Sequence, residues 1–191
     1  AIARREDQII IDVMEAASKK EKSGYEVIHL EVGQPGSLAP KMAAETVKNK
    51  ISKSPMGYTV ALGIPELREK IADLYLRWYN VQVEPERIIV TPGSSGAFIL
   101  TFTGLFDVGD TVGVGSPGYP SYRQILKALS LNTNTIKTFN NNKFQPVVAD
   151  ISNNSLDGLL VASPANPTGS MLDKQSLENL INTANENNVS F

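Results

Sequence analysis

The chain has 191 residues, 41% of them hydrophobic, and its 18 Lys and Arg against 20 Asp and Glu give a net charge of −2. This composition is enough for a sizeable buried core, and the balanced charge argues against a nucleic-acid-binding or membrane-surface protein. Because there is no cysteine and a single histidine, His29, the sequence excludes disulfides, thiolate catalysis and zinc clusters of cysteine or histidine.

The N-terminal residues predict a helix and then a short strand. Four apolar residues recur at helical spacing before the glycine stop at Gly24: Ile10, Val13, Met14 and Ala17. The run VIHLEV at 27–32 then favours a strand. Neither the N-terminus nor the apolar stretch 98–106 has the uninterrupted apolar length of a signal peptide or a membrane span, so we expect a cytoplasmic protein.

Two further helices are expected before residue 80. The first has apolar positions at Met42, Val47 and Ile51. The second is more strongly marked, because it begins at Pro65, where the missing N–H costs little, and continues with regularly spaced apolar residues as far as Trp78.

Beyond residue 86, short apolar runs alternate with helical segments. The runs lie at 87–90, 111–115, 134–138 and 158–162, and the helices begin near Ser95, Pro120 and Asp173. Strands separated by helices imply βαβ crossovers, so we expect an α/β fold of three layers, α/β/α, with a mainly parallel sheet. The asparagine-rich stretch 140–155 is interpreted as an irregular surface connection. The final NNVSF resembles the start of another strand, which suggests that the fold is incomplete in this chain.

Three loops follow strands, at the end of a parallel sheet where ligands bind. They are TPGSSGA at 91–97, GSPGYPSY at 115–122 and ASPANPTG at 162–169. In the first loop, Ser94, Ser95 and Gly96 present N–H groups at the positive end of a helix, which suits an anion. The loop matches neither a Walker loop nor the dinucleotide fingerprint, and an ordinary helix N-terminus is the alternative interpretation.

The other two loops carry an aromatic ring and an amide. Tyr119 and Tyr122 lie in a segment that Pro117 and Pro120 stiffen, where a ring can stack on a flat heterocycle or simply pack. Asn166 can donate to a phenolate oxygen or serve as an ordinary turn residue. A phosphate cradle, a stacking ring and an amide donor together fit pyridoxal phosphate.

Four segments, in this order, resemble the pyridoxal-phosphate-dependent aminotransferases of fold type I, class I/II: GYTVALGIPELRE, IIVTPGSSGAF, VGSPGYPSY and SPANPTG. The resemblance extends from the GQP near Gly33 to the end of the chain. It implies that residues 36–191 form the first part of the cofactor-binding large domain, and that the helix and strand of residues 1–35 contribute to the small domain. It also implies a homodimer.

The resemblance implies roles for five residues of the three loops. Ser94, Ser95 and Gly96 would hold the cofactor phosphate. Tyr119 would stack on the pyridine ring, and Asn166 would hydrogen-bond the 3-hydroxyl oxygen of that ring.

Two more residues have implied roles outside these loops. Tyr58 would reach across the dimer interface to the phosphate of the neighbouring subunit's cofactor, and Gly33 would lie beside the substrate carboxylate. Where the family often has GEPDF, this chain has GQPGS, so the resemblance does not indicate which amino acid is the substrate.

The family's catalytic residues are expected beyond Phe191. They are an aspartate that pairs with the pyridine nitrogen and the lysine that forms the Schiff base. Lys53 is the nearest in local sequence, but it ends a helical pattern, where a solvated surface lysine is typical. We therefore expect this chain to be inactive alone and to be the N-terminal portion of an aminotransferase of amino-acid metabolism, acting on an amino acid and a 2-oxo acid. The alternatives are a carbon-sulfur lyase or decarboxylase of the same fold, or a non-catalytic binding module.

Overall fold

The structure is a computed structural model that describes residues 9–33, 35–55 and 57–191. These residues fall into two compact units that meet in sequence between Val90 and Thr91, and each unit is described here by itself. The expected boundary between residues 35 and 36 is not tested by this division and stays a prediction.

The regular elements of the first unit are helices, and the three long ones were predicted from the sequence. Its elements are α1 (Ile9–Lys22), α2 (Lys41–Ile51), α3 (Pro65–Tyr79) and the short 3-10 helix η2 (Pro85–Arg87). Pro65 occupies the first turn of α3. Asn80 ends the helix in the left-handed conformation, and its N–H donates to the carbonyls of Leu76 and Tyr75. Local signals at both ends therefore account for the limits of this helix.

Two expected strands do not form. The run 27–32 has no regular structure, with the side chains of Ile28 and Leu30 exposed by 81% and 88%. The run 87–90 begins inside η2, and apart from the local hydrogen bonds of that 3-10 helix it makes one of 2.9 Å, from Val90 N–H to the carbonyl of Leu62. An apolar run forms a strand only when a neighbouring strand supplies the ladder, and in the described residues neither run has one.

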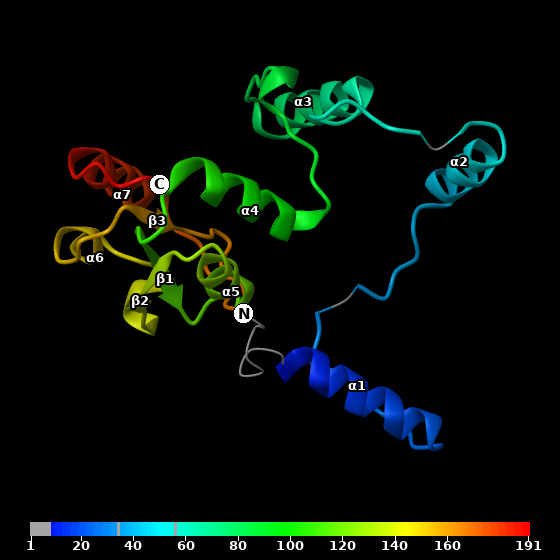
Figure 1. The fold of residues 1–191 in the computed structure, drawn as a ribbon, viewed down its shortest axis with the longest axis horizontal. Coiled ribbons are helices and arrows are strands. Elements are labelled where there is room, and N and C mark those ends of the chain that lie inside the picture. The colour runs from blue at the N-terminus through cyan, green and yellow to red at the C-terminus, as the bar shows by residue number, and fades with distance from the viewer. Residues whose placement is uncertain (1–8, 34, 56) are drawn as a thin grey trace. The chain divides into compact units, whose positions relative to one another are not determined.

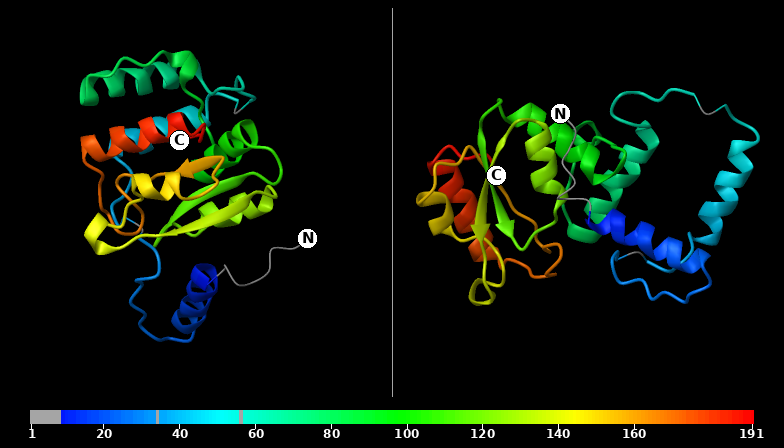
Figure 2. Two further views of the ribbon diagram at one scale, coloured as in Figure 1. Left: turned by 90° about the vertical axis from the view of Figure 1, so that its left-hand side faces the viewer. Right: turned by 60° about the horizontal axis from the view of Figure 1, so that its bottom comes forward.

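The second unit contains a parallel sheet of three strands, which confirms the expected topology (Figure 1; Figure 2). The strands are β1 (Thr111–Ser116), β2 (Asn132–Lys137) and β3 (Gly158–Leu160), in the spatial order β2-β1-β3. Ser190 adds a parallel bridge to Gly158, as the strand-like NNVSF suggested. All three strands therefore direct their carboxyl ends to one edge of the sheet.

Helices alternate with the strands of this unit in sequence. They are α4 (Gly93–Leu105), α5 (Ser121–Ala128), α6 (Val148–Ser152) and α7 (Lys174–Glu186), with the 3-10 helix η3 (Asn140–Asn142) before α6. The interpretation of 140–155 as irregular was wrong in part, because this stretch forms both η3 and α6. Ile151, which is 1% exposed, anchors α6 in the core.

Two apolar clusters cover the two faces of the sheet. Val112 and Val114 point to one face, where they pack with Phe102 of α4 and Leu126 of α5. Gly113 points to the other face, where Leu156, Ile136 and Leu159 would contact any side chain placed there. That second cluster continues into α6 and α7 through Ile151 and Leu180. The unit is thus a three-layer α/β/α arrangement, as expected.

Candidate functional site

Ser94, Ser95 and Gly96 form the first turn of α4. Gly93 begins the helix with a φ of +79°, a backbone conformation that strongly favours glycine. A Cβ on Gly96 would lie 3.1 Å from Cδ of Pro92, so glycine also suits this close approach. The hydroxyl of Thr91 donates to the carbonyl of Gly93 at 2.9 Å, which helps to hold the turn. Both serines are exposed at this end of the helix.

The N-terminus of α4 differs from that of α7 in a way that suits an anion. At α7 the carboxylate of Asp173 accepts the N–H of Ser176 at 2.8 Å, and this contact lowers the pKa of Asp173. At α4 the N-cap is Pro92, no side chain caps the helix, and the first turn contains no acidic residue. The N–H groups and serine hydroxyls of this turn can therefore bind an external phosphate.

Aromatic rings connect the loop 115–122 to α4. The rings of Tyr119 and Tyr122 meet edge to face with centroids 5.4 Å apart, and Tyr122 meets Phe98 in the same way at 5.0 Å. Burial raises the pKa of the Tyr122 hydroxyl, and the neighbouring Tyr119 raises it further. Tyr119 is half-buried in this cluster, one residue beyond Gly118. Its ring is therefore supported by packing on one side.

Asn166 lies in the loop 162–169 after β3. It lines a small hollow together with Gly115 after β1, with Tyr122 and with Gln145. The loop is closed internally by two backbone hydrogen bonds, from Ala165 N–H to the carbonyl of Ser170 at 2.9 Å and from Gly169 N–H to that of Ala165 at 2.7 Å. Tyr122 therefore contacts Phe98 of α4 and Tyr119, and it lines one hollow with Asn166, which links the loops 115–122 and 162–169 to the helix that the first loop begins.

Two residues that support these loops were missed in the sequence. Thr138 is buried, and both its N–H and its hydroxyl donate to the carbonyl of Ser116, each at 3.0 Å. Gln145 is buried and donates to main-chain carbonyls of the Asn166 loop. Thr138 is the last residue of the run 134–138 and Gln145 lies within the asparagine-rich stretch, so no local pattern indicated that either residue supports a loop.

Gly33 and Tyr58 lie in the first unit. The Tyr58 side chain is fully exposed, and a Cβ on Gly33 would meet no heavy atom within 4 Å. Their expected roles depend on a cofactor and a partner subunit and stay predictions. Lys53 is also exposed, just beyond α2.

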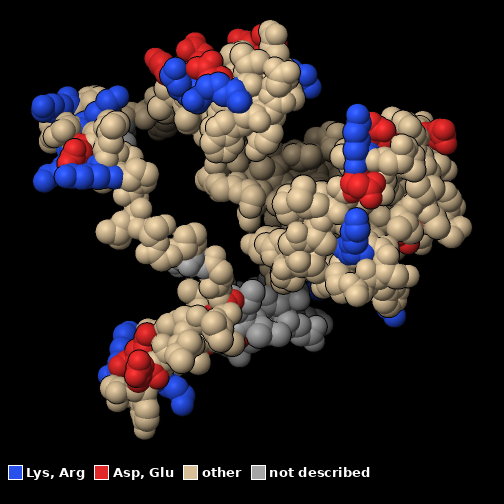
Figure 3. Space-filling view, turned by 180° about the vertical axis from the view of Figure 1, so that it is seen from behind, with Lys and Arg blue, Asp and Glu red and all other residues tan. Residues whose placement is uncertain are grey.

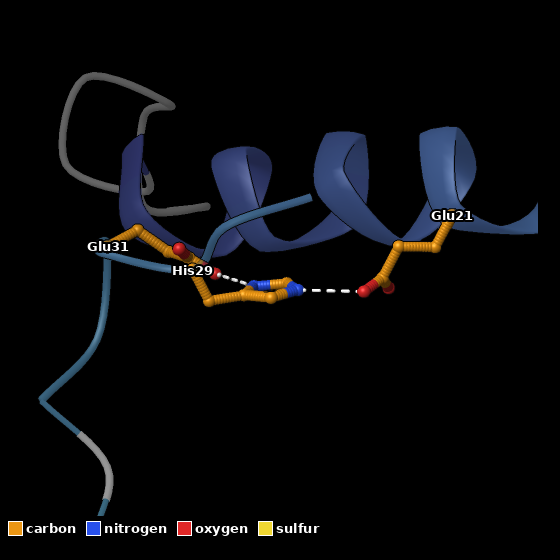
Figure 4. A network of polar contacts seen from close by, with 3 residues as sticks. All are labelled: Glu21, His29 and Glu31. Carbon is orange, nitrogen blue, oxygen red and sulfur yellow. Dashed lines mark hydrogen bonds and ion pairs between the residues drawn. The ribbon is translucent and has the colours of Figure 1, made fainter. Parts of the chain in front are cut away.

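His29 bridges α1 and the segment that leads to Gly33 (Figure 4). Its Nε2 lies 2.9 Å from Oε1 of Glu21, and its Nδ1 lies 2.7 Å from Oε1 of Glu31. The Glu31 contact, followed by that of Glu21, raises the pKa of His29 from 6.5 to about 9 and lowers that of Glu31. The imidazole is therefore charged at neutral pH and fastens this segment to α1.

Comparison with known proteins identifies the family. The family model for aminotransferase class I and II matches residues 25–190. The chain belongs to this family. Over 88% of its length it is 41% identical to a valine–pyruvate aminotransferase of Mycobacterium tuberculosis, of which it covers 44%. Enzymes of the family depend on pyridoxal phosphate, which agrees with the cofactor expected from the three loops.

Solved aminotransferases share the fold. A crystal structure of an aminotransferase from Mycobacterium tuberculosis aligns over 99% of this chain and 50% of its own, with a TM-score of 0.91 and 36% identity. Aspartate aminotransferase from Thermus thermophilus, solved with maleate, aligns over 99% and 52%, with a TM-score of 0.86 and 28% identity. The chain thus spans about half the length of the aminotransferases that it matches.

Neither a membrane-spanning helix nor a metal-binding cluster is present among the described residues of this chain. None of their helices combines the length and apolar character that crossing a membrane requires. No group of three or more His, Asp or Glu side chains among them could hold a metal ion.

Proposed function

We propose that the chain is the N-terminal portion of a pyridoxal-phosphate-dependent aminotransferase that moves an amino group between an amino acid and a 2-oxo acid. The observation that carries this proposal is the place of Tyr122, which contacts Phe98 of α4 and Tyr119 and lines one hollow with Asn166, together with the N-terminus of α4, which has no side-chain cap. The chemistry of the three loops is complementary to a phosphorylated aromatic ring with a hydroxyl group. Family membership supports the same conclusion.

Five side chains and backbone groups of the second unit would hold the cofactor. Ser94, Ser95 and Gly96 would bind the phosphate through N–H groups and hydroxyls at the positive end of α4. Tyr119, supported by Tyr122, would stack on the pyridine ring. Asn166 would donate its amide to the ring oxygen. When bound, the cofactor supplies an electron sink for amino-group transfer.

The remaining functional groups lie outside the second unit. We propose that Tyr58 reaches the phosphate in a partner subunit of a homodimer, which its full exposure permits, and that Gly33 lies beside the substrate carboxylate. The Schiff-base lysine and the aspartate for the pyridine nitrogen would lie beyond Phe191, so this chain supplies none of the catalytic residues. We place the complete enzyme in the cytoplasm and in amino-acid biosynthesis.

The test uses the complete protein and residues 1–191 side by side. With pyridoxal phosphate and borohydride, the complete protein should be labelled on one lysine and should convert an amino acid and a 2-oxo acid, whereas residues 1–191 should show neither property. Labelling of one lysine in residues 1–191, with transamination, would refute the assignment of catalytic residues. Release of carbon dioxide or of a sulfur product instead of amino transfer would indicate a decarboxylase or a lyase.

A charge placed at the phosphate site tests the residues themselves. Ser95→Asp in the complete protein should weaken pyridoxal phosphate binding by about a hundredfold, because a carboxylate would face the phosphate. Ser155→Asp adds the same charge at an exposed position outside the three loops and should leave the affinity unchanged. Equal affinities for the two variants would contradict the assigned phosphate site.

A further inference from the structure

Gln145 is a buried polar residue that the proposed function does not yet use. Its side chain is 2% exposed, although it lies in a stretch rich in surface asparagines. Its Nε2 donates two hydrogen bonds of 3.0 Å, one to the carbonyl of Ala162 and one to that of Ser170. A buried polar group without a hydrogen-bond partner costs free energy, so buried polar side chains keep their partners. The two hydrogen bonds of Gln145 are therefore a specific feature of the fold.

The two acceptors lie at opposite ends of the loop that carries Asn166. Ala162 follows β3, and Ser170 comes just after Gly169, so one amide group joins the start of the loop to its end. The loop's own hydrogen bonds do not involve Ala162, although the hydroxyl oxygen of Ser163 accepts the N–H of Leu172 at 3.0 Å. Gln145 therefore connects Ala162, which follows β3, directly to Ser170, at the other end of the loop.

Gln145 is itself held in place. Its N–H donates to the carbonyl of Asn142 at 3.0 Å, and the next residue, Pro146, is buried. The Gln145 side chain also lines the hollow that contains Asn166 and Tyr122. A shift of this side chain would therefore alter the hollow and the two ends of the loop together.

We propose that Gln145 is a positioning residue that sets the place of Asn166 against the cofactor ring. This inference rests on the proposed function, because it takes the ring oxygen of pyridoxal phosphate as the group that Asn166 contacts. The chemistry favours a primary amide: its two N–H bonds on one nitrogen can serve two carbonyls, whereas a carboxylate can only accept and methionine has no donor.

The experiment compares variants of the complete protein. Gln145→Met keeps the length of the side chain and removes both donors, and Gln145→Glu replaces them with acceptors that face two carbonyls. Gln175→Met is the matched control, because Gln175 is exposed on α7 and bonds only to Asn179 in the described structure. Ile151→Val is a second control, which loosens the nearby core and removes no hydrogen-bonding group.

Two readouts separate positioning from general stability. The first is hydrogen exchange at the N–H groups of Ala165 and Gly169, which Gln145→Met should speed by about tenfold or more relative to both controls. The second is the pH midpoint of the cofactor's absorption band, which should shift in the same direction as in Asn166→Ala, by a smaller amount in Gln145→Met and a larger one in Gln145→Glu. Neither control should shift this midpoint.

The outcomes distinguish the two proposals. If Gln145→Met lowers the unfolding midpoint as Ile151→Val does, with unchanged loop exchange and an unchanged absorption midpoint, Gln145 is a structural residue only and the inference is wrong. If the unaltered protein does not bind pyridoxal phosphate, or Asn166→Ala leaves the absorption band unaffected, the proposed function or the role of Asn166 fails. In that case the inference falls with it, and loop exchange reports only whether Gln145 holds the loop.

Discussion

The two units of the chain obtain their structure in different ways. In the second unit, apolar side chains from α4, α5, α6 and α7 are buried on both faces of the sheet. In the first, Ala17 is the one buried side chain among the described residues, and large apolar groups such as Trp78 stay mostly exposed. Local signals can define helices, but burial of apolar surface is what stabilises a tertiary fold.

Polar contacts show the same difference. The ion pairs of the first unit, such as Glu15 with Lys19 and Lys70 with Asp73, lie on helix surfaces, where Figure 3 shows Lys and Arg mixed with Asp and Glu. Exposed pairs of this kind contribute little to stability. In the second unit, Thr138 and Gln145 are buried and hydrogen-bonded to the main chain. The second unit thus carries the interactions that resist unfolding.

Removing a buried side chain from the second unit and an exposed one from the first should give the largest difference in the free energy of unfolding. Leu126→Ala removes a side chain with no exposed surface and should destabilise the second unit by about 2–5 kcal/mol. Leu76→Ala on α3 makes the same change at a half-exposed position and should cost less than about 1 kcal/mol. Urea unfolding of residues 1–191, followed by circular dichroism, measures both values.

The single tryptophan makes this comparison sharper. Trp78 lies on α3, so its fluorescence follows the first unit. Leu126→Ala should move the transition seen by circular dichroism and leave the Trp78 transition in place. If both transitions move together, the two units unfold as one and the comparison fails.

Adding a methyl group at a glycine should change stability by a smaller amount, and the sign should depend on the space around that glycine. A Cβ on Gly158 in β3 would overlap the ring of Phe106, so Gly158→Ala should cost about 1–3 kcal/mol by overpacking. Gly104 in α4 has no heavy atom within 4 Å of the equivalent position, so Gly104→Ala should stabilise by about 0.5–1 kcal/mol. Thermal unfolding midpoints that fall for both variants would show that α4 packs differently from this description.

The contacts of His29 with Glu21 and Glu31 in the first unit should have the smallest effect on stability, and this effect should depend on pH. The pKa of His29 is raised to about 9. The stability that its charged form contributes is therefore fully present below the ordinary pKa of 6.5 and is lost as the pH rises through about 9. Because His29 is the only histidine, NMR titration of its ring protons reports this value directly.

Two variants and added salt test the origin of this shift. Glu31→Gln should lower the pKa of His29 more than Glu21→Gln does, because the Glu31 contact is the larger cause. Salt should lower it as well, since both contacts are exposed to solvent. A His29 pKa near 6.5 in the unaltered chain would mean that its contacts with Glu21 and Glu31 do not form in solution.

The accuracy of the sequence predictions follows the same division between local and distant causes. The helix from Pro65 and the one after Asp173 carry their own signals, and both were predicted correctly. The strands at 111–115 and 134–138 were also predicted correctly, since each has a neighbouring strand in the sheet. The runs 27–32 and 87–90 have similar apolar content but no neighbour, and the pattern alone could not show this.

The candidate site was predictable to the extent that its residues belong to the loops. Ser94, Tyr119 and Asn166 follow strands or begin helices, so their chemistry could be interpreted from spacing. Gln145 could not be found in this way, because its partners, Ala162 and Ser170, are 17 and 25 residues away. A supporting residue is defined by contacts that only the folded chain creates.

The central position of β1 also sets an order in which the second unit can fold. Contacts between β1 and the end of β2, such as Ser116 with Thr138, close 22 residues, whereas those toward β3, such as Thr111 with Asp157, close 46. Closing the longer segment costs more chain entropy, so pairing of β1 with β2 should come first and β3 should join later. The loop with Asn166 follows β3. The Asn166 loop should therefore take its place only after β1 has paired with β2 and their first apolar cluster can be buried.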